Sequence, residues 1–201
     1  MVKPRLLARR RQDPGSKWAR TTIAVLSTIG IIDTGSITLS RWGLIGSLSC
    51  PGGLQGCEEV LNSPWGTIFK NNIVTIPLSL LGFISYSIVL IMTILPFLNK
   101  ISENRIDMSR KTWSLLFLLS CCMSIFSILL LWLMFAKINA FCFFCLLSFF
   151  ISISIFLLTI IGGGWEDRRN LIFRGIVMSM SVFLIGLIWI SAVTPKISNA
   201  T

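Results

Sequence analysis

The 201-residue chain contains no histidine and a single tyrosine, and only 8 acidic residues stand against 18 Lys and Arg. Without histidine, the protein cannot use imidazole to bind zinc or haem or to transfer protons. Charged residues make up 13% of the chain, whereas soluble domains contain about 25%. The composition argues against an ordinary soluble protein and leaves its 6 cysteines as the main reactive side chains.

Hydrophobic residues, 54% of the chain, are gathered into five long runs. A run of roughly 18 or more apolar residues is long enough for a helix to cross a hydrocarbon core about 30 Å thick. We therefore predict membrane spans at about residues 19–39, 74–98, 113–135, 138–161 and 172–193. The first run is too long for a signal peptide and lacks a small-x-small cleavage site, so we expect a retained anchor.

The basic residues are distributed unevenly between the ends of these spans. Fourteen of the 18 lie before the first span, between spans two and three, or between spans four and five; the other side receives only Arg41, Lys70, Lys137 and Lys196. This asymmetry predicts a cytoplasmic N-terminus and an outer C-terminus. The net charge of +10 is thus interpreted as a topology signal, and no nucleic-acid partner is expected.

The predicted organisation is an all-α integral membrane protein with membrane lipid around it. Residues 1–18 form a basic cytoplasmic tail, and residues 19–201 form one five-span membrane domain. Each span satisfies its own backbone hydrogen bonds, which favours a single helical bundle. The long connection at residues 40–73 lies on the outer side.

Cys142 and Cys145 form a C-x-x-C motif at the outer start of the fourth predicted span. This spacing brings the two sulfurs within about one helical turn, close enough for a disulfide. A helix N-terminus favours the thiolate form of Cys142. The motif is flanked by Phe141, Phe143 and Phe144, which suit an apolar ring better than a metal ion. Redox chemistry is favoured, and no metal site is expected.

Cys50 and Cys57 lie in the outer connection, within a segment rich in Gly and Pro. One interpretation is a static disulfide, because outer compartments favour such bonds. The other is a mobile pair that exchanges with partners. The position of both pairs on one predicted face favours the second interpretation.

Three further features of the chain carry weaker signals. The adjacent Cys121 and Cys122 lie far from the predicted outer surface and are interpreted as packing residues. Asp33 lies inside the first span, where a carboxylate is costly; it is a functional candidate, or it reaches the surface or hydrogen-bonds to the loop. Ser63 could donate to a quinone carbonyl or simply end a short loop helix before Pro64.

Several of these motifs together resemble the vitamin K epoxide reductase family, over roughly residues 23–161. They are the outer cysteine pair, Ser63-Pro64-Trp65-Gly66, the Ile76–Gly82 segment followed by Tyr86, and the C-x-x-C that opens span four. The five-span form resembles the prokaryotic branch. This resemblance implies a four-helix transmembrane bundle around a quinone, with a fifth, peripheral transmembrane helix.

The resemblance also implies roles for individual residues. Cys145 would lie beside the quinone ring, with Cys142 as its disulfide partner. Cys57 would exchange with Cys142, and Cys50 would face the protein partner. Ser63 would take the loop-helix serine position, and Phe141 and Phe149 would complete the quinone site. Phe149 stands where vertebrate members carry a tyrosine, which favours quinone reduction over epoxide reduction.

The implied function is a disulfide-forming oxidoreductase in the plasma or inner membrane, or in a thylakoid, with its active face periplasmic or lumenal. A thioredoxin-like protein, either separate or a fused domain missing from this chain, would supply electrons. The quinone would be of ubiquinone, menaquinone, phylloquinone or plastoquinone type. Two alternatives remain open. A carrier of soft metal ions would use the paired cysteines at several depths, and a structural subunit would need none of them.

Overall fold

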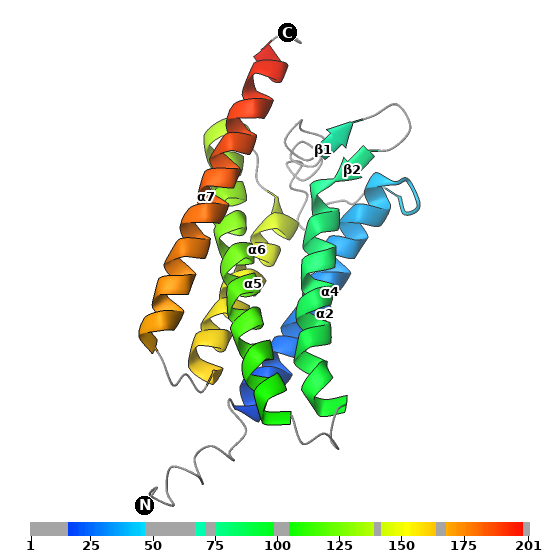
Figure 1. Cartoon of the computed structure of the whole chain (residues 1–201). Helices are drawn as coiled ribbons and strands as arrows, with labels where there is room; N and C mark the ends of the chain where they lie inside the picture. Colours follow the sequence, from blue (N-terminus) through cyan, green and yellow to red (C-terminus); the bar gives the residue numbers. More distant parts are fainter. Residues whose placement is uncertain are drawn as a thin grey trace, which may run out of the picture.

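The computed structural model describes residues 16–46, 67–70, 75–98, 105–138, 142–163 and 168–198. Five long helices dominate this part of the chain and run nearly side by side (Figure 1). They are α2 (Lys17–Arg41), α4 (Leu78–Leu98), α5 (Arg105–Leu133), α6 (Phe143–Gly162) and α7 (Arg168–Ser198). Four of them, α2, α4, α5 and α6, contain stretches long and apolar enough to cross a membrane. These four predicted spans are confirmed by length and composition.

The fifth helix differs from the other four. Its apolar stretch, Ile172–Ile188, is shorter than a full span among the residues described. Its membrane crossing, and the direction in which the bundle faces, therefore stay predictions from the apolar runs and the basic residues.

Two of the predicted spans begin before the helices that contain them. Span two was expected from residue 74, but Thr75–Pro77 forms strand β2, which pairs antiparallel with β1 (Thr67–Lys70). Span four was expected from residue 138, but α5 continues into a π-helical turn, η2 (Met134–Ile138), and α6 begins only at Phe143. The described part of the chain is therefore all-α except for one small hairpin, which lies at the end of the bundle where α6 begins (Figure 1).

The core lies between α2, α4, α5 and α6. It contains Ala19, Ile23, Tyr86, Val89, Trp113, Leu116, Ile151 and Ile155. Many other large apolar side chains on these helices are exposed. Exposure of this kind is expected of helices that face lipid rather than water.

Helices α2 and α6 approach closely at the end where α2 begins. Gly162 lies against the Ala19 side chain and the Trp113 ring, so any side chain at position 162 would overlap them. The backbone N–H of Ser16 also donates to the Gly162 carbonyl at 2.9 Å. These contacts fix the antiparallel register of the two helices. Helix α6 ends at Gly162, the first of three consecutive glycines and one residue beyond the predicted end of span four.

Candidate functional site

The C-x-x-C pair lies at the N-terminus of α6, as its position in the chain predicted. Cys142 has an extended backbone and is the N-cap of α6, where its Sγ accepts a hydrogen bond from the Cys145 backbone N–H at 3.3 Å. The Cys145 thiol donates to the same Sγ at 2.7 Å. The two Sγ atoms are thus close enough to react with each other. Both are free thiols in the structure.

The local geometry favours the thiolate of Cys142, which precedes the first residue of the α6 span. The hydrogen bond from the Cys145 thiol lowers the pKa of Cys142, and bonds from backbone N–H groups of the first turn add to this effect. Burial and the charge of Asp33 act in the opposite direction. Thiolates attack disulfides and electrophiles, whereas thiols do not. Cys142 is therefore the better prepared nucleophile of the two.

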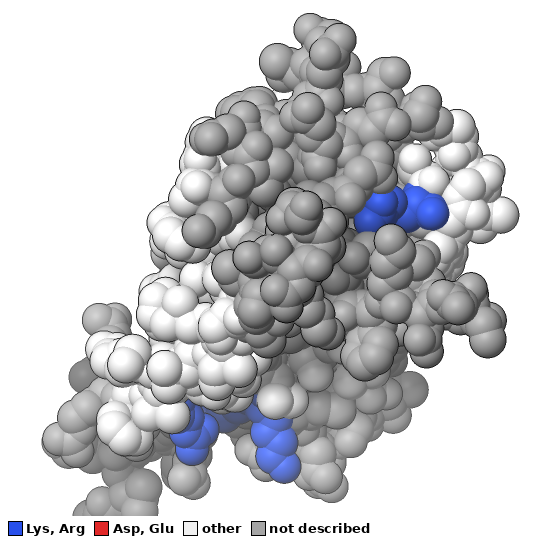
Figure 2. All heavy atoms as spheres, turned by 90° about the horizontal axis from the view of Figure 1, so that it is seen from above, with Lys and Arg blue, Asp and Glu red and all other residues white. Residues whose placement is uncertain are grey.

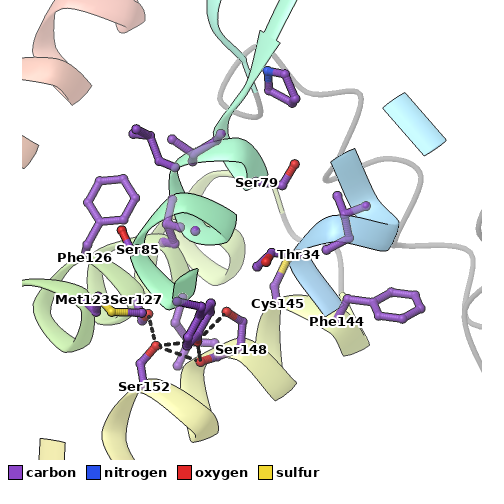
Figure 3. Close-up of a pocket in the computed structure, with 18 of the residues that line it drawn as sticks. Thr34, Ser79, Ser85, Met123, Phe126, Ser127, Phe144, Cys145, Ser148 and Ser152 are labelled. Carbon is purple, nitrogen blue, oxygen red and sulfur yellow. Dashed lines mark hydrogen bonds between the residues drawn. The ribbon is translucent and has the colours of Figure 1, made fainter. Parts of the chain in front are cut away.

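A cavity of about 350 Å³ lies beside this pair, among α2, α4, α5 and α6. Its walls are mainly apolar, and they include Leu81, Leu119, Met123, Phe126 and Phe144. Cys145 points its thiol to this cavity (Figure 3), whereas the fully buried Cys142 is not among the described residues that line it. An apolar molecule in the cavity could thus contact the Cys145 sulfur without contacting the Cys142 sulfur.

A cluster of hydroxyl groups joins α4, α5 and α6 along the same cavity (Figure 3). The Tyr86 hydroxyl on α4 lies 2.9 Å from the Ser148 carbonyl and 2.9 Å from the Ser152 hydroxyl on α6. On α5, Ser127 donates to the Ser152 hydroxyl at 3.2 Å, and Ser124 donates to the Ser152 carbonyl at 3.2 Å. These hydroxyls satisfy one another inside an apolar bundle, where an unpaired polar group is costly.

The sequence comparison agrees with this geometry. Residues 21–160, which include both members of the C-x-x-C pair, match the sequence model of the vitamin K epoxide reductase family.

The chain belongs to the vitamin K epoxide reductase family.

Membership in the vitamin K epoxide reductase family makes this chain an integral membrane thiol oxidoreductase of a family associated with quinones. The helical bundle and the paired thiols are the features expected of such an enzyme.

Several residues assigned from the family resemblance lie outside the part of the chain that the structure describes. They are Cys50, Cys57, Ser63 and Phe141, and the roles given to them stay predictions. The described chain stops at Gly46 and resumes at Thr67. Helix α2 ends, and strand β1 begins, at the end of the bundle where α6 begins (Figure 1).

Phe149, assigned to the quinone site, is not among the described residues that line the cavity; Phe144 is. The Phe149 ring instead packs edge-on against Phe150, with ring centroids 5.5 Å apart. The lining face of α6 follows Phe144, Cys145, Ser148 and Ser152. Phe149 lies just beyond the edge of that face, and its role in binding stays a prediction.

The vicinal cysteines of α5 face different surroundings. Cys121 is buried and its Sγ lies 3.8 Å from the Gly175 carbonyl of α7, which fits the packing role predicted for it. Cys122 lines the cavity, although its sequence context had indicated only a packing role. Because successive residues of a helix differ by about 100° in direction, the two thiols do not form one site. No group of three or more metal-binding side chains occurs within the described ranges.

Asp33 does not reach the membrane surface, which was one of the possibilities for it. Its side chain is 6% exposed, and neither carboxyl oxygen has a hydrogen-bond partner among the described residues. Viewed from the end where α6 begins, the described surface shows blue basic atoms among white ones and no red acidic atom (Figure 2). The carboxyl is held inside the bundle rather than presented to this face.

The fifth helix contributes to the site more than the family resemblance implied. Helix α7 packs against α5, where Gly175 lies against Phe117 and Gly186 lies against Leu129. Val182, between these two contacts, lines the cavity. Although α7 is peripheral to the other four helices, it closes one side of the site.

Proposed function

We propose that this protein is a quinone-dependent, disulfide-forming oxidoreductase of the prokaryotic branch of its family. Electrons would pass from a thioredoxin-like protein to Cys50 and Cys57, then to Cys142 and Cys145, and finally to a membrane quinone. The observation that carries the proposal is the position of the pair: Cys145 borders an apolar cavity, and the sulfur of its buried partner, which does not line the cavity, lies 2.7 Å away.

The cavity suits a quinone ring. Its volume of about 350 Å³ is within the usual range for small-molecule sites. The walls are largely apolar, with a few hydroxyls from Ser79, Ser85 and Ser127. Apolar walls favour a lipid-soluble ring, and hydroxyls can donate to its carbonyl oxygens. A bound quinone would supply a two-electron acceptor beside Cys145.

The two cysteines take different parts in the proposed exchange. A thiolate of the reduced loop pair, at Cys57, attacks the Cys142–Cys145 disulfide at Cys142 and releases Cys145 as a thiol. Cys50 then closes the loop disulfide and releases Cys142 as the thiolate that the Cys145 N–H and thiol stabilise. That exchange leaves Cys142 and Cys145 as a dithiol. When the dithiol closes again to a disulfide, its two electrons leave toward the cavity through Cys145. The loop pair would lie on the outer face of the membrane, where exported proteins acquire disulfides.

The soft-metal carrier is not favoured by the described residues. Such a carrier needs thiols that converge on one ion, but Cys121 contacts α7 while Cys122 borders the cavity. A carrier role would also give no reason for an apolar cavity beside Cys145.

The test is quinone reduction by purified protein in lipid nanodiscs, with a dithiol reductant as electron donor under anaerobic conditions. Cys145→Ala should abolish quinone reduction while exchange at Cys50 and Cys57 remains measurable. Cys121→Ala is the matched control, because this thiol contacts the Gly175 carbonyl of α7 and is not among the described residues that line the cavity, so the variant should keep nearly the wild-type rate. Wild-type quinone reduction by Cys145→Ala would rule out the proposed path.

A further inference from the structure

The buried carboxyl of Asp33 lies on α2, eight residues before the end of that helix. Helix α2 packs against both α4 and α6. On α2, Gly30 is one turn before Asp33, and it contacts the ring of Tyr86, whose hydroxyl reaches Ser148 and Ser152 on α6. Asp33 is therefore close to the junction of all three helices.

The register of α2 and α6 gives the depth of Asp33 relative to Cys145. The two helices are antiparallel, and Ala19 lies opposite Gly162. Asp33 is 14 residues after Ala19, and Ser148 is 14 residues before Gly162. Because both helices rise by about 1.5 Å per residue, Asp33 lies at about the depth of Ser148, one helical turn from Cys145.

At this depth the charge of Asp33 acts on the Cys142 thiol and disfavours its thiolate. The titratable groups that face Asp33 from the neighbouring elements are Tyr86 on α4 and Cys142 and Cys145 at the start of α6. Helices α4 and α6 contain no Asp, Glu, Lys or Arg. The thiols are thus the main groups whose charge can respond to that of Asp33.

Burying an unpaired carboxylate costs free energy. A carboxyl inside a membrane helix is also a functional candidate by default. Structural carboxylates are normally held by cations or several donors, and Asp33 has neither kind of partner among the residues described. Its surroundings suit a group that takes up and releases a proton rather than one that holds a fixed charge.

We propose that Asp33 carries a proton between the Cys142–Cys145 pair and the cavity during each oxidation of the dithiol. This inference rests on the function proposed above. When the S–S bond forms, two electrons and two protons leave the two thiols, and both electrons and both protons end on the quinone as hydroquinone. Asp33 accepts one of these protons as the thiol that loses it becomes a thiolate. It then releases the proton to the cavity past Thr34, the next residue of α2, which lines the cavity. The protonation of Asp33 is therefore unchanged over the cycle.

Asp33→Asn tests this inference, because asparagine keeps the shape but cannot carry the proton. The full chain is used in nanodiscs, with the other four cysteines replaced by alanine so that only Cys142 and Cys145 change redox state. The first measurement is the redox difference infrared spectrum without quinone. Wild type should show the carbonyl stretch of a protonated carboxyl that changes on oxidation, and Asp33→Asn should lack it. The second measurement is the midpoint potential of the Cys142–Cys145 pair as a function of pH. In wild type the slope of this plot should change at the pH where Asp33 titrates, and in Asp33→Asn that change of slope should be absent.

The rate of quinone reduction by the reduced pair is the third measurement. General acid–base groups typically contribute about 100-fold or more, so Asp33→Asn should be slower by about that factor. Asp33→Glu, which keeps the carboxyl, should recover part of the rate. An Asp33→Asn variant with the wild-type rate and the wild-type dependence of potential on pH would overturn the inference.

Two outcomes keep the two proposals separate. If wild type fails to reduce quinone, the proposed function fails, but the infrared band and the potential still decide the role of Asp33. If Asp33→Asn does not fold, Asp33→Glu decides: a carboxyl band that shifts in frequency and still responds to oxidation supports the inference. A Glu variant with no redox-sensitive carboxyl band overturns it.

Discussion

The Sγ atom of Cys142 accepts hydrogen bonds from both the backbone N–H and the thiol of Cys145, at 3.3 and 2.7 Å. Cys145 therefore stabilises the thiolate form of Cys142. The arrangement favours the thiolate form of Cys142 and leaves Cys145 as the thiol that faces the cavity.

The reactivity of Cys142 should depend on a donor at position 145. Removing the donated hydrogen bond in Cys145→Ala should raise the pKa of Cys142, so its reaction with a small thiol reagent should need a higher pH than in Cys145→Ser, where a hydroxyl can still donate. The measurement is the pH dependence of modification by mass spectrometry, in chains without the other four cysteines. Equal pH midpoints for the two variants would contradict the role given to the side-chain hydrogen bond.

The contact between Gly30 and Tyr86 should be sensitive to a single methyl group. A Cβ at position 30 would lie 2.8 Å from three atoms of the Tyr86 ring, and that ring is held by its hydroxyl on α6. Gly30→Ala should therefore lower the free energy of unfolding by about 1–3 kcal/mol. Gly35→Ala is the control, because its Cβ would meet Phe83 at an ordinary 3.4 Å. The thermal unfolding temperature should fall for the first variant and stay within error for the second.

Arg20 should stabilise the opposite end of the bundle. Its guanidinium donates to the Ser109 hydroxyl at 2.7 Å and lies 4.9 Å from the centroid of the Trp113 ring. Replacing it by Met should cost about 2 kcal/mol, since a buried charged hydrogen bond and a cation–π contact are lost. Arg20→Lys keeps the charge but not the planar group, so its loss should be intermediate. An unchanged unfolding temperature in Arg20→Met would argue against a stabilising role.

Filling the cavity should impair quinone use without impairing thiol exchange. Met123 borders the cavity on α5, and Met123→Trp places a larger side chain in the cavity wall. The KM for quinone should rise by about tenfold or more, while exchange at Cys142 stays unchanged. Leu115→Trp, on the exposed surface of the same helix, should leave both values alone. A rise in KM for the Leu115 variant as well would point to a general effect of the larger ring.

Hydropathy and local spacing predicted much of the fold. Four spans, the end of α6 at Gly162 and the position of Cys142 and Cys145 at the start of α6 follow from patterns contained within single segments. The exact helix starts did not, because an apolar run marks the thickness of the hydrocarbon core rather than the first helical hydrogen bond. Thus α5 begins at Arg105, well before the apolar run at residue 113.

The polar part of the site was not predictable in the same way. Tyr86, Ser127 and Ser152 come from three different helices and meet only through tertiary packing. Within each span, a serine has the pattern of a small packing residue. The approach of Asp33 to the thiols likewise depends on the register of α2 against α6, for which no local sequence signal exists.

Because Val182 forms part of the cavity wall, changes in the last helix, α7, would affect the cavity. The helices that hold the sulfurs do not include α7, so a disturbance of α7 would spare the thiol chemistry. It would instead unseal the flank of the cavity next to α5 and admit acyl chains where the ring is proposed to bind. Electron transfer to the acceptor would then be impaired while disulfide exchange continued, although no cysteine had moved.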